Sequence, residues 1–167
     1  MLVLAAACAL AAPATAARTA PAAGSSALEQ AVLSEVNALR VSKGLAPLRY
    51  SRPLAAAARA HSAAMATRGF FSHSSADGSA FWKRVQRHYR SRGYGRWSVG
   101  ENLLWSSREL NAAAALDIWL NSPKHRTIML RAHWREVGVG AVHVVSGRGV
   151  YRGHEVTIVT ADFGVRR

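Results

Sequence analysis

Cysteine is almost absent from this sequence: the only one, Cys8, lies close to the N-terminus. No disulfide can therefore form within residues 17–167, although many small exported domains depend on such bonds. Half of the residues are hydrophobic, and five Trp, four Tyr and four Phe supply bulky side chains. A chain of 167 residues buries enough apolar surface to fold as one domain without a metal or a disulfide. We therefore expect packing alone to stabilise the fold.

Acidic residues are also scarce, since nine Asp and Glu stand against 22 Lys and Arg and the formal net charge is +13. Only three of the basic residues are lysines, so the charge comes mainly from arginine, whose forked guanidinium matches carboxylates and phosphates. A positive field attracts polyanions such as nucleic acid, anionic lipid or an acidic wall polymer. Composition alone does not choose among these partners.

A long hydrophobic run is missing as well. Residues 2–17, LVLAAACALAAPATAA, are apolar, but they are too short and too rich in Ala for a membrane-spanning helix. Ala14-Thr15-Ala16 fits the pattern read by signal peptidase, so we predict a signal peptide at 1–16 that is cleaved before Ala17. Acylation of Cys8 and an uncleaved leader are alternatives, and the lack of Lys or Arg after Met1 leaves an upstream start open. The leader predicts a secreted protein, or one of the periplasm or cell envelope, with no transmembrane segment in its mature part.

Hydrophobic periodicity in the rest of the chain predicts helices first and strands last, with no internal repeat. A small-residue linker at 17–27 precedes a single predicted domain at 28–167. The predicted helices cover 28–43, 51–68, 81–89, 109–120 and a short segment that carries His125. The predicted strands cover 99–105, 137–145 and 156–163, and the last two form an antiparallel hairpin. This order predicts an α+β fold instead of repeated βαβ units.

Four short strings stand out because of their order and spacing. They are Phe71-Ser72-His73-Ser74, Val99-Gly100-Glu101-Asn102-Leu103, Trp119-Leu120-Asn121-Ser122-Pro123-Lys124-His125-Arg126 and Glu136-Val137-Gly138-Val139-Gly140. Together they resemble the CAP superfamily of cysteine-rich secretory proteins, antigen-five proteins and pathogenesis-related proteins. The resemblance is to the short, cysteine-free bacterial branch in particular, and it covers about residues 28–165. Each string alone occurs by chance, so the resemblance depends on all four.

The resemblance implies an α-β-α sandwich in which a small antiparallel sheet lies between helical layers. It also implies a central cleft where two His and two acidic residues meet, sometimes with a divalent metal. Three of these positions fall on His73, Glu101 and His125. The fourth falls on Ser122, which removes one carboxylate from the cleft. Asn102 completes the predicted cleft and should hold the chain after Glu101 through backbone hydrogen bonds.

Two imidazoles and one carboxylate form a ligand set that leaves one position open on zinc, so His73, Glu101 and His125 are the candidate metal ligands. A hydrogen-bonded His/Glu cluster without metal is the alternative. The long separations along the chain do not help to decide, because only the fold brings the three residues together. No nucleophile elbow is present, so we expect no catalytic serine. His61 falls on the buried face of the second helix and is expected to be a hydrogen-bonded core histidine.

The segment 81–97, FWKRVQRHYRSRGYGRW, combines basic side chains with five aromatic ones. This combination suits stacking and phosphate contacts. No recognition helix, zinc finger or RNA-binding signature accompanies it, so specific nucleic-acid binding is not expected. The alternatives are a surface for anionic lipid or wall polymer and a solvated basic face at the edge of the cleft.

Three functions are compatible with these features. The first is a secreted binding module for a small apolar ligand or an envelope component. The others are a structural envelope protein without active chemistry and a metal-dependent, peptidase-like hydrolase that uses Glu101. The missing acid and the lack of an acid–base pair favour binding over catalysis. We also expect a monomer.

Overall fold

The computed structural model describes residues 26–107 and 110–167. The predicted signal peptide at 1–16, Cys8 and most of the predicted linker lie outside the described residues. The first helix begins at Ala27, one residue before the predicted start of the domain. In chain order the elements are α1 (Ala27–Ser42), β1 (Arg49–Tyr50), α2 (Arg52–Arg68), α3 (Phe81–His88), β2 (Trp97–Ser106), α4 (Ala112–Leu120), α5 (Pro123–Met129), β3 (Glu136–Val144), the 3-10 turn η1 (Gly149–Tyr151) and β4 (Val156–Arg166).

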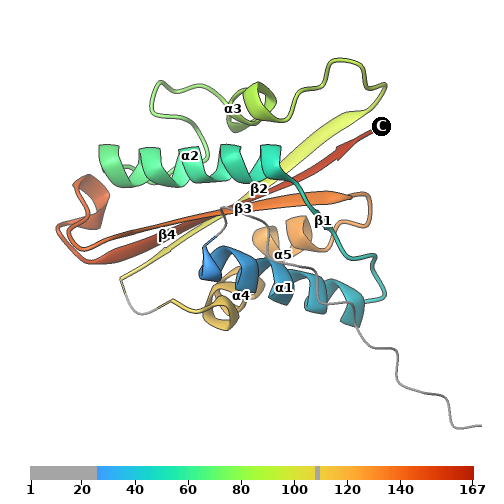
Figure 1. The fold of residues 1–167 in the computed structure, drawn as a ribbon. Coiled ribbons are helices and arrows are strands. Elements are labelled where there is room, and N and C mark those ends of the chain that lie inside the picture. The colour runs from blue at the N-terminus through green and yellow to red at the C-terminus, as the bar shows by residue number, and fades with distance from the viewer. Residues whose placement is uncertain (1–25, 108–109) are drawn as a thin grey trace, which may run out of the picture.

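The elements form three layers around a sheet with the strand order β1-β3-β4-β2. Helices α2 and α3 cover one face, and α1, α4 and α5 cover the other (Figure 1). This confirms the predicted α-β-α sandwich of the α+β class. One detail differs, because the sheet is mixed and not purely antiparallel. The two-residue strand β1 pairs in parallel with β3, where the chain crosses the edge of the sheet between α1 and α2.

Capping side chains explain where several helices begin and end. Ser26 and Glu29 form a capping box at the start of α1, in which each side chain accepts a hydrogen bond from the other residue's backbone N–H. Gly69 ends α2 in the left-handed conformation, with φ of 70°. Asn111 accepts a hydrogen bond from the N–H of Ala114, so α4 begins at Ala112, whereas the predicted start at 109 lies outside the described residues.

The long strands β2 and β4 extend beyond their predicted limits because they pair with each other along their whole length. Their register runs from Trp97 opposite Arg166 to Ser106 opposite Thr157. Strand β3 pairs with the other side of β4 and forms the predicted hairpin. Strand β4, the last in the sequence, is therefore hydrogen-bonded on both sides.

The two faces of the sheet pack in different ways. Beneath the sheet, large side chains such as Trp119, Trp134 and Phe163 fill the core between the strands and α1, α4 and α5. Above the sheet, the Ala-rich helix α2 lies directly against β3. A Cβ atom on Gly138 would lie 1.9 Å from the backbone nitrogen of Ala55, so the strand backbone and the helix backbone touch. This close approach needs glycine in the strand and small residues in the helix.

Within the two described ranges, no helix combines the length and the apolar character needed to cross a membrane.

We predict that Gly138→Ala lowers the free energy of unfolding by about 3 kcal/mol or more, because backbone atoms of α2 have no room to move away from the new methyl group. Urea denaturation measures this change. Gly95→Ala is the matched control: its Cβ would meet nothing nearer than the Arg167 carbonyl at 3.9 Å. The control should change stability by less than about 0.5 kcal/mol. Equal stability of the two variants would contradict the direct contact between α2 and β3.

Candidate functional site

Glu101 lies in the middle of β2, and its side chain faces the layer of α2 and α3. Its partner in the sheet register is Asp162 on β4, so the two carboxyl groups project from the same face of the sheet. Glu101 is 2% exposed and Asp162 is fully buried. Two acidic groups are thus held side by side beneath the upper helical layer.

Both carboxylate oxygens of Glu101 have partners. One is 2.8 Å from Nδ1 of His73, which follows α2, and the other forms an ion pair with the guanidinium of Arg84 on α3. Arg84 is itself buried, at 7% exposure, and it also donates to the carbonyl oxygen of His73 at 3.2 Å. A further contact at 3.3 Å links it to the hydroxyl of Ser75. Arg84 therefore neutralises Glu101 and holds the loop that carries His73.

His73 and Glu101 differ sharply in exposure. The His73 side chain is 53% exposed, whereas that of Glu101 is 1% exposed. Because the carboxylate accepts a hydrogen bond from His73 Nδ1–H, the second ring nitrogen, Nε2, is the one left for other partners. The cluster thus consists of a buried ion pair with an imidazole at its surface.

His61 on α2 lies beneath this cluster as the predicted core histidine. It is 1% exposed, and its Nε2 lies 2.8 Å from the carbonyl oxygen of Ser72. Burial lowers its pKa, and the positive charge of Arg84 adds to this effect, although Glu101 partly opposes it. His61 is therefore neutral at physiological pH and donates its Nε2–H to Ser72, which fixes the chain just before His73.

The other three predicted cleft residues come from the opposite side of the site. His125 on α5 has no described hydrogen bond or ion pair with His73 or Glu101. Its pKa is lowered by burial and, to a smaller extent, by the electrostatic effect of the His73 ring, so the two imidazoles are neighbours. Asn102 donates to the carbonyl oxygen of His125 at 3.0 Å and thereby ties α5 to β2, instead of holding its own loop. Ser122 occupies the N-cap position of α5, but its side chain makes no capping hydrogen bond.

Asp162, like Arg84, is a residue of this site that the sequence alone did not reveal. Its two carboxyl oxygens are buried without a hydrogen-bonding partner among the described residues. Burial raises the pKa of Asp162 well above its usual range, and the negative charge of Glu101 raises it further, against a smaller opposing effect of Arg84. Asp162 therefore keeps a proton to a higher pH than an ordinary aspartate does. An acidic residue within the apolar run of β4 was the signal that could have revealed it.

The residues present do not fit a three-ligand zinc site. Zinc would have to compete for Glu101 with the cation Arg84, which forms an ion pair with one of its oxygens, and with His73, whose Nδ1 lies 2.8 Å from the other. Within residues 26–107 and 110–167, no group of three or more His, Cys, Asp or Glu residues is arranged to hold a metal ion. The zinc ligand set His73, Glu101 and His125 stays a prediction, and the geometry favours the hydrogen-bonded cluster.

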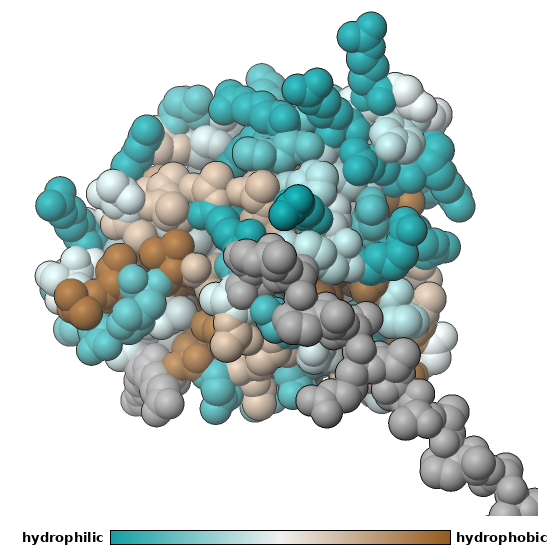
Figure 2. Space-filling view, in the orientation of Figure 1, coloured by the Kyte–Doolittle hydropathy of each residue, from teal (hydrophilic) through white to brown (hydrophobic). Residues whose placement is uncertain are grey.

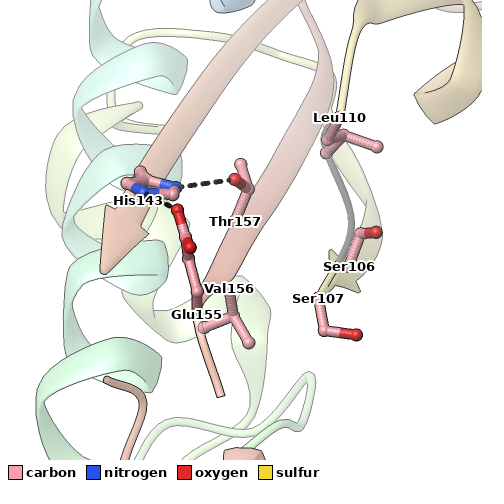
Figure 3. Close-up of a pocket in the computed structure, with 7 residues that line it drawn as sticks. All are labelled: Ser106, Ser107, Leu110, His143, Glu155, Val156 and Thr157. Atoms are coloured by element: carbon pink, nitrogen blue, oxygen red, sulfur yellow. Dashed lines mark hydrogen bonds and ion pairs between the residues drawn. The ribbon is translucent and has the colours of Figure 1, made fainter. Parts of the chain in front are cut away.

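Two surface cavities of about 430 and 320 Å³ lie away from the cluster. The larger cavity is lined by His143, near the end of β3 (Figure 3). Nε2 of His143 lies 3.1 Å from a carboxylate oxygen of Glu155, and its Nδ1 lies 3.1 Å from the hydroxyl oxygen of Thr157. Both members of the His143–Glu155 pair are more than half exposed, so their interaction contributes little. No predicted cleft residue lines either cavity.

The three-layer sandwich is the architecture of a CAP-type domain. The profile of the cysteine-rich secretory protein family, CAP, matches residues 33–163. The chain belongs to this family.

Two curated relatives come from Bacillus subtilis strain 168. The uncharacterized membrane protein YlbC is 31% identical over 112 residues, which are 67% of this chain and 31% of that protein. The uncharacterized protein YkwD is 32% identical over 118 residues, which are 70% of this chain and 43% of that protein. The chain therefore spans less than half the length of each of these relatives.

Solved structures share the fold. An extracellular protein with an SCP domain from Bacillus anthracis superposes with a TM-score of 0.62 at 28% identity, over 83% of this chain and 40% of that one. An outer surface protein from Borrelia burgdorferi gives a TM-score of 0.61 over 81% of this chain and 90% of that one. At 18% identity the second likeness concerns the fold alone.

Asp162→Asn should weaken the dependence of stability on pH. The folded protein keeps the Asp162 proton to a higher pH than the unfolded chain does, so it binds more protons above the ordinary pKa of an aspartate. The free energy of unfolding therefore falls as the pH rises above the ordinary pKa of an aspartate. Asparagine does not titrate, so the substitution removes this contribution to the pH dependence of stability. Urea denaturation between about pH 5 and about pH 8 should show a smaller fall for the variant. The exposed Asp117→Asn is the control, and parallel profiles for Asp162→Asn and the wild type would refute the buried proton.

Proposed function

We propose that this domain is an extracellular binding module that holds a small, mainly apolar ligand by a hydroxyl group at His73. The observation that carries the proposal is the half-exposed imidazole of His73, fixed from below by the buried Glu101–Arg84 ion pair. A polar group held rigidly at the surface recognises a ligand without the entropic cost of ordering a mobile side chain.

The orientation of the ring supports a hydroxyl as the recognised group. Nδ1 of His73 is used by Glu101 at 2.8 Å. In the neutral imidazole the other nitrogen, Nε2, is a hydrogen-bond acceptor. It would therefore accept a hydrogen bond from a ligand O–H. An ether or a plain hydrocarbon offers no such donor.

An aromatic side chain next to His73 supports an apolar body for the ligand. The centre of the Phe81 ring lies 6.4 Å from that of the His73 ring, and the planes of the two rings meet at 60°. Phe71, two residues before His73 in the sequence, is 37% exposed, and Trp82, which follows Phe81 on α3, is 43% exposed. Small-molecule sites typically combine aromatic side chains with a few polar groups.

The same geometry favours binding over hydrolysis. A metal-dependent hydrolase would need Glu101 either as a ligand or as a base, and Arg84 and His73 already engage both of its oxygens. The arrangement is that of a rigid recognition group. A purely structural protein of the envelope would share the fold but would bind neither a long-chain alcohol nor its methyl ether.

Location outside the cytoplasm is part of the proposal. Residues 1–16 carry the signal-peptide pattern, and the similar structure from Bacillus anthracis is an extracellular protein. Export in this chain is best checked by N-terminal sequencing of the mature protein, which should begin at Ala17.

A fluorescent C12 alcohol and its methyl ether test the proposed recognition of a hydroxyl. The wild type should bind the alcohol about tenfold more tightly than the ether, which is the value of one hydrogen bond. His73→Ala should abolish this difference while leaving the binding of the ether unchanged. His143→Ala removes another half-exposed imidazole and serves as the control. Fluorescence titration gives both dissociation constants, and equal affinity of the wild type for the two probes would exclude the proposal.

Calorimetric titration with zinc tests the metal prediction separately. Because Glu101 is engaged by Arg84, we expect no saturable one-to-one binding that depends on the two histidines. A saturable heat in the wild type that is lost in both His73→Ala and His125→Ala would establish the metal site instead. A heat that neither substitution changes would mean that zinc binds elsewhere.

A further inference from the structure

Arginines gather at one end of the sheet, where β1, β2 and β3 begin and β4 ends. The backbones of Arg96 and Arg167 exchange two hydrogen bonds, at 2.8 and 3.1 Å, just beyond the pairing of β2 with β4. Arg135 donates its backbone N–H to Gly164 on β4 at 3.1 Å, and Arg49 on β1 pairs with the first residue of β3. Five guanidinium groups define this basic end: Arg49, Arg96, Arg131, Arg135 and Arg166.

Several of these arginines lie close enough to His133 to affect its pKa. Burial lowers its pKa, and the positive charges of Arg131, Arg96 and Arg135 lower it further. Arg131 and Arg135 belong to the loop between α5 and β3, whereas Arg96 precedes β2. Cations from two separate parts of the sequence therefore act on one imidazole.

Only one described acidic side chain faces this end, and it is already engaged. Glu136 accepts a hydrogen bond from the hydroxyl of Tyr89 and lies 3.8 Å from Arg49 and 3.9 Å from Arg166. The remaining buried acids, Glu29 among them, lie elsewhere and are used within the fold. The five arginines therefore exceed the carboxylates near them, and their mutual repulsion opposes folding.

Arg166 is held rigidly between two aromatic rings. Its guanidinium carbon lies 4.2 Å from the centre of the Tyr89 ring and 5.0 Å from that of Tyr94. Tyr94 is 43% exposed. Stacking keeps an arginine in place. One Nη group of Arg166 donates to the carbonyl oxygen of Arg90 at 3.5 Å, which leaves the other Nη group to donate to an anion. The basic end thus contains a fixed anion-binding group, not only mobile charges.

We propose that the basic end binds a linear polymer that carries phosphate groups along its length. Arginine's forked donors match phosphate oxygens, and several guanidinium groups in one area suit a repeating anion better than a single small one. The proposal goes beyond the His73 cluster and does not depend on it.

The surface around the basic end favours a polymer over a bilayer. Side chains that would enter lipid, such as Val145 and Val150, are exposed at the hairpin between β3 and β4, at the opposite end of the sheet. In Figure 2 apolar side chains gather on the left of the molecule, whereas the right-hand side is mostly hydrophilic. Tyr94 is the exposed aromatic ring that the basic end offers, which is too little for stacking on successive bases of a nucleic acid.

Inorganic polyphosphate is the probe for this proposal. The double variant R96S/R131S removes two exposed cations whose side chains make no described contact. It should lower the affinity about tenfold at 100 mM NaCl and reduce the slope of log K against log salt concentration by about two. The control R68S/R148S removes the same charge at the other end of the sheet, and it should change the affinity less than about twofold. Fluorescence anisotropy over a salt series measures both quantities, and thermal unfolding verifies that both variants fold.

Three results would overturn the proposal. An equal loss of affinity in the two double variants would show that only net charge matters. Binding to phosphatidylglycerol vesicles without binding to polyphosphate would identify a lipid surface instead. Tighter binding of single-stranded DNA than of polyphosphate with the same number of phosphates would identify a nucleic-acid surface. Binding of the C12 alcohol by R96S/R131S should stay unchanged, which separates this surface from the His73 cluster.

Discussion

The site depends on one buried ion pair, between Glu101 in the middle of β2 and Arg84 on α3. A carboxylate without a partner in this position would cost several kcal/mol, and Arg84 compensates for that cost. The same guanidinium also binds the carbonyl oxygen of His73. One side chain therefore fixes the helix, the loop and the acid relative to one another. Burial and the negative charge of Glu101 raise the pKa of the neighbouring Asp162, and among the described residues no second cation pairs with this carboxyl group.

The sequence predicted the layers of the fold well, because its strings and its periodicity are local. It also identified both partners of the contact between His73 and Glu101. Arg84 and Asp162 were missed for a physical reason: each acquires its role only through tertiary contact. Within the segment 81–97 Arg84 resembles its exposed basic neighbours, and the register that places Asp162 opposite Glu101 cannot be read from either strand alone.

The basic segment illustrates the same point, because the fold divides it between two locations. Arg84 is buried in the site, whereas Arg96 joins arginines from distant parts of the chain at one end of the sheet. Three acidic residues, Glu29, Glu101 and Asp162, are buried, and so are Arg40 and Arg84. The fold therefore decides which charges of the sequence reach the surface.

The position of β4 affects how the domain acquires its structure. This strand comes last in the sequence but lies between β2 and β3, with which it forms all of its ladders. In a growing chain that has not yet reached residue 156, β2 therefore has no strand partner and β3 has only the two-residue β1, and Glu101 lacks the strand beside it. Local helices can form early, but the sheet closes only when the final segment is available. The domain therefore cannot complete its sheet until almost its whole sequence has been synthesised.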